Sequence, residues 1–294
     1  MRTEKEIMRQ ILGFAEADER VRLVGMEGSR TNPNVPKDRF RDYDISFLVT
    51  ELASFQQNDA WLDRFGPRAM MQKPEAMALF PPELGNWFSY LILFEDGNKL
   101  DLTLIPLSEL SAYLASDRLL KILLDKDGMA PPLPEPTDAD YWIRRPSAAF
   151  FDDCCNEFWM TSTCIVKGLC RGELPYAAYH MEAIVRPQLL TMLSWKIGAE
   201  TSFDYSLGKH YKFIRRYLTE SEWSLLAKTY RMDTTEACRS ALTAASQLFA
   251  AASRTVAQRL GFLYPDYERK VTAYVRRMWE EARRAGNDTE EGDC

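Results

Sequence analysis

The stretch GSRTNPNVPKDRFRDYDISFLV, residues 28–49, decides the fold. It opens with a glycine and a serine, crosses a polar loop with two prolines, and ends in an apolar run rich in β-forming residues. Asp42 and Asp44 are two residues apart at the head of that run, where a strand directs both carboxylates to the same side of a sheet. Two carboxylates that close repel each other unless a cation lies between them. The stretch therefore predicts a cation site on a β-strand.

Two neighbouring features predict what this site does. Gly28 and Ser29 follow the apolar run 21–26, and such a strand end lets backbone N–H groups and a hydroxyl approach a phosphate. A third carboxylate, Asp101, lies in a second apolar run, residues 99–105. Oxygen ligands beside a phosphate site suit Mg²⁺. Together these parts favour nucleotidyl transfer assisted by two metal ions.

This pattern of Gly-Ser, spacer, Asp-x-Asp and a later strand Asp resembles the nucleotidyltransferase superfamily of the DNA polymerase β type. The wider sequence, from about Met1 to about Tyr267, resembles the aminoglycoside 6-adenylyltransferase (streptomycin adenylyltransferase) family. Glu27 is a departure from the superfamily, in which a hydrophobic residue usually precedes Gly-Ser. Five segments carry the narrower resemblance: residues 27–32, 71–74, 80–88, 95–103 and 151–159.

The resemblance implies transfer of AMP from ATP to a hydroxyl of an aminoglycoside, at position 6 of the streptidine ring of streptomycin, with release of pyrophosphate. Asp42, Asp44 and Asp101 would be the catalytic and metal-binding residues for Mg²⁺, and Asp101 is the candidate acceptor of the substrate's hydroxyl proton. Two alternatives stay open. One is a nucleotidyltransferase with a protein or RNA acceptor, and the other is a non-catalytic nucleotide-binding domain.

The turn at Gly28 and Ser29 also predicts which residues contact the triphosphate of the nucleotide. We expect Gly28 and Ser29 to contact the triphosphate, while Arg30 pairs either with a phosphate or with Asp42. A later basic cluster either reaches the triphosphate or is a solvated basic face. Its members are Lys209, Lys212, Arg215 and Arg216.

A cationic acceptor has to be held by carboxylates and aromatic faces, because guanidinium groups favour both. Asp153 and Glu157 are four residues apart and so share a helix face, which is also typical of a capping or salt-bridge feature. The candidates for contact with the acceptor are Glu83, Trp87, Glu95, Asp152, Asp153, Glu157, Trp159 and Glu182.

Composition and charge argue against several classes of protein. The net charge of −6 opposes a nucleic-acid backbone and would attract a cationic small molecule. No apolar run is long enough to span a bilayer, and the charged start of the chain lacks a signal-peptide pattern. The six cysteines lack the spacing of a zinc site. We therefore expect a cytoplasmic monomer that binds neither membrane nor nucleic acid.

The chain order predicts an α+β protein, in which a mixed β-sheet is followed by an all-helical C-terminal domain. The expected parts are a nucleotidyltransferase domain over 1–130, a proline-rich linker over 131–146, a helical substrate- and nucleotide-closing domain over 147–285 and a frayed tail over 286–294. Predicted strands are 21–26, 42–49, 69–72, 87–94, 100–105 and 119–124. Predicted helices are 4–17, 58–65 with Asn58 as N-cap, 150–169, 182–195, 221–230, 234–260 and 267–284.

Overall fold

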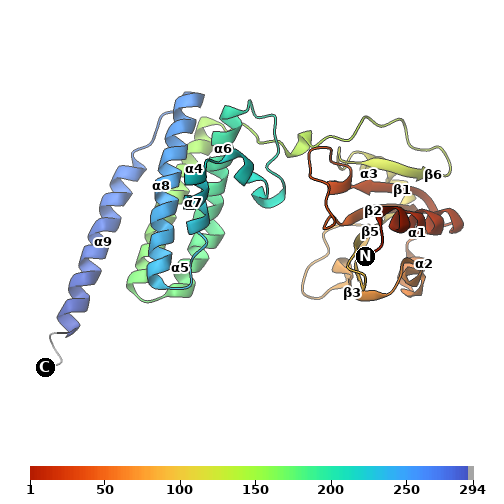
Figure 1. Cartoon of the computed structure of the whole chain (residues 1–294), viewed down its shortest axis with the longest axis horizontal. Coiled ribbons are helices and arrows are strands. Elements are labelled where there is room, and N and C mark those ends of the chain that lie inside the picture. Colours follow the sequence, from red (N-terminus) through yellow and green to blue (C-terminus); the bar gives the residue numbers. More distant parts are fainter. Residues whose placement is uncertain (291–294) are drawn as a thin grey trace. The chain divides into compact units, whose positions relative to one another are not determined.

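The structure is a computed structural model that describes residues 1–290, with side chains to residue 284. The chain divides into two compact units, an N-terminal unit over Met1–Asp140 and a helical unit that begins at Tyr141. Figure 1 shows the mixed sheet of the first unit and the helices of the second, which confirms the predicted α+β class.

The N-terminal unit is built on a six-stranded sheet in the order β3-β4-β5-β2-β1-β6. Its central pair, β2 and β5, is parallel, and the other neighbours are antiparallel. The strands are β1 (Val21–Glu27), β2 (Tyr43–Val49), β3 (Arg68–Gln72), β4 (Phe88–Phe94), β5 (Lys99–Pro106) and β6 (Lys121–Asp125).

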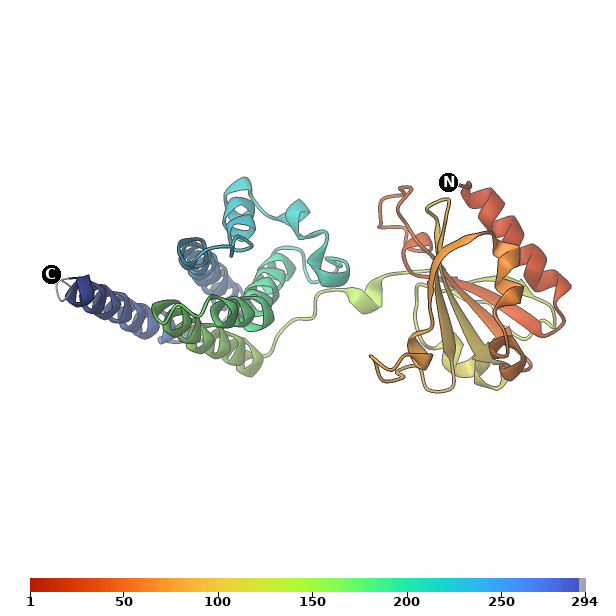
Figure 2. The same ribbon diagram turned by 90° about the horizontal axis from the view of Figure 1, so that it is seen from below.

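Alternation of side chains gives this sheet two different faces. On one face, the helix α1 (Glu4–Ala17) packs an aromatic cluster in which Phe14 lies 5.4 Å from Trp61, centroid to centroid. Figure 2 shows α1, in red, running alongside the strands. The other face carries a smaller core in which Leu48 packs with Tyr113 of the short helix α3 (Leu110–Leu114). Asp44 and Ser46 lie on this second face, because they alternate with the buried Ile45 and Phe47.

The helical unit has a single apolar core between its long helices. Phe158 and Phe249 stack at its centre, with ring centroids 3.8 Å apart. Thr219 and Glu222 form a reciprocal capping box that defines the start of α7. The helices are α4 (Ala148–Cys170), α5 (Leu174–His180), α6 (Arg186–Glu200), α7 (Glu220–Lys228), α8 (Thr235–Leu260) and α9 (Tyr267–Glu290).

Several predicted elements differ from the structure. The predicted helix 182–195 is a π-helical turn, Met181–Val185, followed by α6, and Pro187 at the start of α6 cannot donate a hydrogen bond to the preceding turn. The predicted helix 58–65 is a 3₁₀ helix, Ala60–Phe65, and Asn58 Oδ1 accepts a hydrogen bond from the Ala60 N–H at 3.1 Å. The short helices α2 (Ala53–Gln56), α3 and α5 were not predicted.

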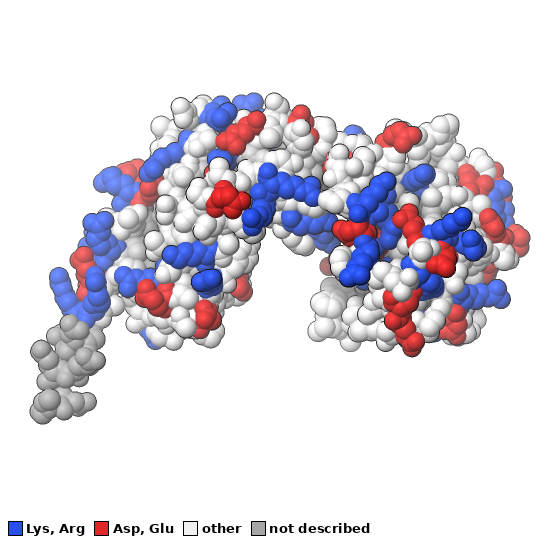
Figure 3. All heavy atoms as spheres, viewed as in Figure 1, with Lys and Arg blue, Asp and Glu red and all other residues white. Residues whose placement is uncertain are grey.

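The predicted frayed tail also differs in part, because α9 continues to Glu290; residues 291–294 lie outside the described residues. Among the helices that the structure describes, none is long and apolar enough to cross a bilayer. On the face drawn in Figure 3, acidic and basic side chains intermingle over the N-terminal unit and along α9.

Candidate active site

Three carboxylates lie in one row across the sheet. Glu27 of β1 is paired in register with Asp44 of β2, and Asp44 is paired with Asp101 of β5. Because partners in adjacent strands point to the same face, the three side chains stand side by side. Asp44 and Asp101 are 57 positions apart in sequence, and the parallel pairing of β2 with β5 brings them together as predicted.

The row is electrostatically crowded. Burial, together with the negative charges of Asp101 and Asp42, raises the pKa of Asp44 to about 6. Gly28 begins the 3₁₀ turn Gly28–Arg30 in a left-handed conformation, with φ +69°, directly beside this carboxylate. A Cβ at Gly28 would lie 2.4 Å from Asp44 Oδ2, so the turn approaches the carboxylate this closely only with glycine.

Asp42 is not placed by strand alternation, contrary to the prediction from the sequence. It lies one residue before β2, so strand alternation does not orient its side chain. Instead, Lys99 at the start of β5 connects it to the row. The Lys99 Nζ atom is 3.2 Å from Asp42 Oδ2 and 2.6 Å from Asp101 Oδ2.

The chemistry of these donors fits a divalent cation. All are carboxylate oxygens, which Mg²⁺ prefers, and the Oδ1 atom of Asp101 is buried without a hydrogen-bond partner. In the part of the chain that the structure describes, no three His, Cys, Asp or Glu side chains converge as a ready-made metal site. The assignment of Asp42, Asp44 and Asp101 as metal ligands therefore stays a prediction.

Arg30 contacts Asp42, one of the two partners that the sequence left open for it. Its guanidinium donates to the backbone carbonyls of Asp42 and Arg41, each at 2.8 Å, and pairs with Glu4, also at 2.8 Å. The group also lies 3.5 Å above the Tyr43 ring centroid, and the side chain is only 6% exposed. Arg30 therefore holds the loop that leads to Asp42, and its contact with a phosphate stays a prediction. Ser29 stays half-buried in the same turn.

A hydrogen-bonded network behind the row was missed by the sequence reasoning. The hydroxyls of Tyr113 and Ser46 donate to the Glu27 carboxylate. Burial raises the pKa of Glu27 to about 7. Tyr113 lies over Gly25, where any Cβ would meet its hydroxyl at 1.6 Å. The available signal was Glu27 itself, a carboxylate where the superfamily has a hydrophobic residue.

The acceptor candidates of the N-terminal unit occupy different surroundings. Glu83 and Glu95 are exposed in loops. Trp87 is half-buried, donates its indole N–H to Glu109 at 2.5 Å and packs edge-on against Tyr113. Glu109 thus positions the one aromatic candidate of this unit, and no sequence motif had marked it.

The acceptor candidates of the helical unit separate into core and surface residues. Trp159 is only 4% exposed and packs against Phe158 in the core, so the prediction that its ring faces a substrate is wrong. Asp152 is half-buried and accepts a hydrogen bond from the Tyr267 hydroxyl at 3.2 Å. The three other candidates are exposed on helical surfaces: Asp153, Glu157 and Glu182.

The basic cluster lies in a strained segment of the helical unit. His210 and Tyr211 both have positive φ values, 55° and 60°, which residues other than glycine rarely adopt. Lys209 and Lys212 flank them and are exposed. The geometry is compatible with either of the two roles proposed from the sequence.

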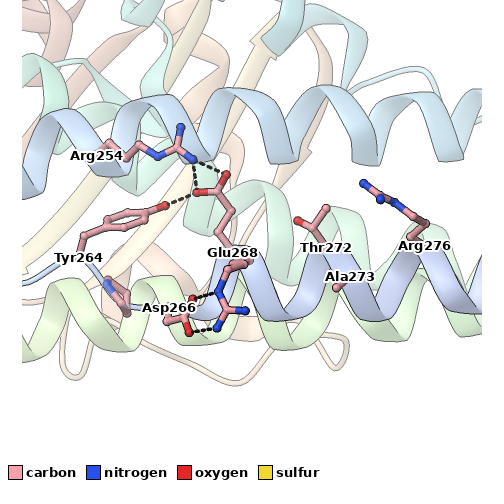
Figure 4. A pocket seen from close by; sticks show the side chains of 9 residues that line it. Arg254, Tyr264, Asp266, Glu268, Thr272, Ala273 and Arg276 are labelled. Atoms are coloured by element: carbon pink, nitrogen blue, oxygen red, sulfur yellow. Dashed lines mark hydrogen bonds and ion pairs between the residues drawn. The ribbon is translucent and has the colours of Figure 1, made fainter.

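A pocket of about 590 Å³ lies between α8 and α9, away from all predicted residues (Figure 4). Two of the three arginines that line it are paired with carboxylates, and the third is Arg276. Arg254 forms a bidentate pair with Glu268, at 2.5 and 2.6 Å, and Arg269 pairs with Asp266 at 2.6 Å.

Comparison with known proteins decides the family. The family model described as streptomycin adenylyltransferase matches residues 1–278, which include both units and every predicted site residue. The chain belongs to the streptomycin adenylyltransferase family. This confirms the resemblance on which the site prediction depends.

Individual relatives of the streptomycin adenylyltransferase family match over nearly their whole length. A protein named aminoglycoside 6-adenylyltransferase from Bacillus subtilis (strain 168) is 54% identical, covering 94% of this chain and 97% of its own. One of the same name from Staphylococcus aureus is 43% identical, covering 95% and 100%. A crystal structure of a Bacillus subtilis aminoglycoside 6-adenyltransferase is 49% identical, covering 95% and 99%, with a TM-score of 0.47.

Proposed function

We propose that this protein transfers AMP from ATP to the 6-hydroxyl of streptomycin and releases pyrophosphate. The observation that carries the proposal is the pairing of Asp44 with Asp101 in register beside the Gly28 turn, with Asp42 linked to Asp101 through Lys99. Membership of the streptomycin adenylyltransferase family supports the reaction class, and the names of its relatives support an aminoglycoside acceptor. Adenylylation adds bulk and negative charge to the drug, which would give resistance.

In the proposed reaction, the hydroxyl oxygen of the drug attacks the α-phosphorus of ATP. A new P–O bond forms, the bond to the bridging oxygen breaks, and pyrophosphate leaves with its electron pair. Asp101 accepts the hydroxyl proton. The Gly28-Ser29 turn supplies backbone N–H groups to the phosphates. Mg²⁺ held by Asp42, Asp44 and Asp101 would offset the negative charge of the phosphates.

The test is release of pyrophosphate by the purified protein with Mg²⁺, ATP and streptomycin. We expect release to need all three, and Asp44→Asn to lower kcat about a thousandfold. Asp63→Asn is the matched control, because Asp63 is an exposed carboxylate of the same unit paired with Arg68. Wild-type turnover by Asp44→Asn would refute the assigned site. Release without streptomycin would refute the acceptor.

The position of transfer needs a separate measurement. The isolated product should carry one AMP, and its NMR spectrum should show phosphorus coupled to the proton at carbon 6 of the streptidine ring. Coupling to another ring proton would keep the reaction and change its position. A mass increase on the protein itself would instead favour the alternative of a protein acceptor.

A further inference from the structure

The Lys99 side chain occupies the middle of the carboxylate cluster. Lys99 and Asp101 are two apart on β5, so strand alternation directs both to the same side of the sheet. The ammonium lies 2.6 Å from Asp101 Oδ2 and 3.2 Å from Asp42 Oδ2. Asp44 stands beside Asp101 in register. A single positive charge therefore lies among three negative ones.

This arrangement differs from an ordinary surface ion pair. Lys73 offers the comparison, because its side chain is 35% exposed and that of Lys99 is 36% exposed. Lys73 pairs with Asp59 at 2.8 Å, whereas Lys99 bridges carboxylates from two separate segments of the chain. An isolated pair of this exposure contributes little to stability. A bridge that separates mutually repelling carboxylates has a second effect, since without it Asp42 and Asp101 lose the cation that contacts both of them.

We propose that Lys99 is a positioning residue that holds Asp42 and Asp101 together in the metal-free protein and competes with a divalent cation for them. The inference rests on the proposed function, in which these carboxylates bind the metal.

Three observations support the competition. The contacted Oδ2 atoms of Asp42 and Asp101 are those that an incoming cation would also need. The other oxygen of Asp101, Oδ1, is buried and has no hydrogen-bond partner, so the cluster is not fully satisfied by the lysine. The side chains of Lys99 and Asp42 are 36% and 42% exposed, so a hydrated ion can reach the bridge from solvent.

The test measures Mn²⁺ binding without nucleotide, by titration calorimetry or by the spectroscopic signal of free Mn²⁺. Lys99→Met should bind Mn²⁺ about tenfold more tightly than wild type, because a like charge is removed from the site. Lys99→Arg keeps the charge and should bind as wild type does. Lys73→Met is the matched control and should leave the affinity unchanged.

A second readout is the melting temperature. Lys99→Met should melt below wild type without metal, and saturating Mn²⁺ should restore it. Equal or weaker Mn²⁺ affinity in Lys99→Met overturns the inference. If Lys99→Met/Asp44→Asn binds Mn²⁺ as tightly as Lys99→Met, or if no variant binds it, the metal site of the proposed function fails as well. Asp44-dependent binding that Lys99→Met leaves unchanged overturns only the role of Lys99.

Discussion

The two units of this protein differ in where they place their candidate carboxylates. In the N-terminal unit, the carboxylates of Asp44 and Glu27 are largely buried on one face of the sheet, and the Arg30 side chain is buried nearby. In the helical unit, three of the four candidate carboxylates are exposed on helix surfaces, and the buried charge among the described residues is a cation, Arg186, which donates to the Thr229 carbonyl. Strands in fixed register can hold like charges close together, and such preorganisation suits bond-making chemistry. Exposed side chains on helices suit recognition of a substrate.

The largest expected effect is a loss of stability on truncating Trp159 in the core of the helical unit. Trp159→Ala should lower the unfolding free energy by about 3–5 kcal/mol, because it leaves a cavity beside Phe158. Urea denaturation measures this change. Met160→Ala is the control, since Met160 is the next residue of α4 and is 60% exposed. If Trp159→Phe raised the KM for streptomycin without lowering stability, Trp159 would touch substrate after all.

The next prediction concerns the close approach in the N-terminal unit. Gly28→Ala should lower kcat about a hundredfold, because the new Cβ displaces the Asp44 carboxylate and the left-handed backbone resists a side chain. Gly13→Ala is the matched control. Gly13 is exposed in α1 and an added methyl would have no atom within 4 Å, so this change should slightly raise stability and leave kcat unaltered. Equal kcat in both variants would contradict the role of the turn.

The burial of Glu27 should make the unfolding free energy depend on pH. The pKa of Glu27 rises from 4.5 to about 7 on folding, so the native state binds more protons than the unfolded state between those values. The unfolding free energy should therefore fall as pH rises through this window and level off above it. Glu27→Gln should remove about 2 kcal/mol of this fall. Urea denaturation at pH 5 and pH 8 measures it, and identical slopes for both proteins would contradict the burial of the charge.

The smallest expected effect concerns the basic cluster of the helical unit. Lys209→Ala and Lys212→Ala should each raise the KM for ATP about fivefold, the value of one charge-assisted contact. Steady-state kinetics measures this. Lys228→Ala provides the control, because Lys228 is an exposed lysine at the end of α7. Unchanged KM values in all three variants would make the cluster a solvated basic face.

The sheet was predictable because its strands carry apolar alternation bounded by turns. Five of the shorter or irregular helical segments were not predicted correctly, because fewer than two turns give no periodic pattern to read. They are α2, α3, α5, the π turn Met181–Val185 and the 3₁₀ helix Ala60–Phe65.

The site was predictable where it depends on a motif and unpredictable where it depends on packing. The proximity of Asp44 and Asp101 was predicted from their strands and the family resemblance. The orientation of Asp42 was not, because Asp42 precedes β2, and the metal-binding role of all three stays a prediction. The sequence could not choose between the two partners of Arg30, because backbone carbonyls and a ring contact leave no trace in sequence. Tyr113 reaches Glu27 only through the placement of α3, which no local pattern reveals.

The parallel pairing of β2 with β5 has a consequence for how the molecule assembles. Their contact joins segments far apart in the chain, so it forms late relative to local turns and hairpins. Its closure pushes Asp101 against Asp44, an encounter that electrostatic repulsion opposes. The strand that delivers Asp101 also carries Lys99 two residues earlier. When β5 pairs with β2, Lys99 therefore supplies a positive charge beside Asp101 that offsets this repulsion.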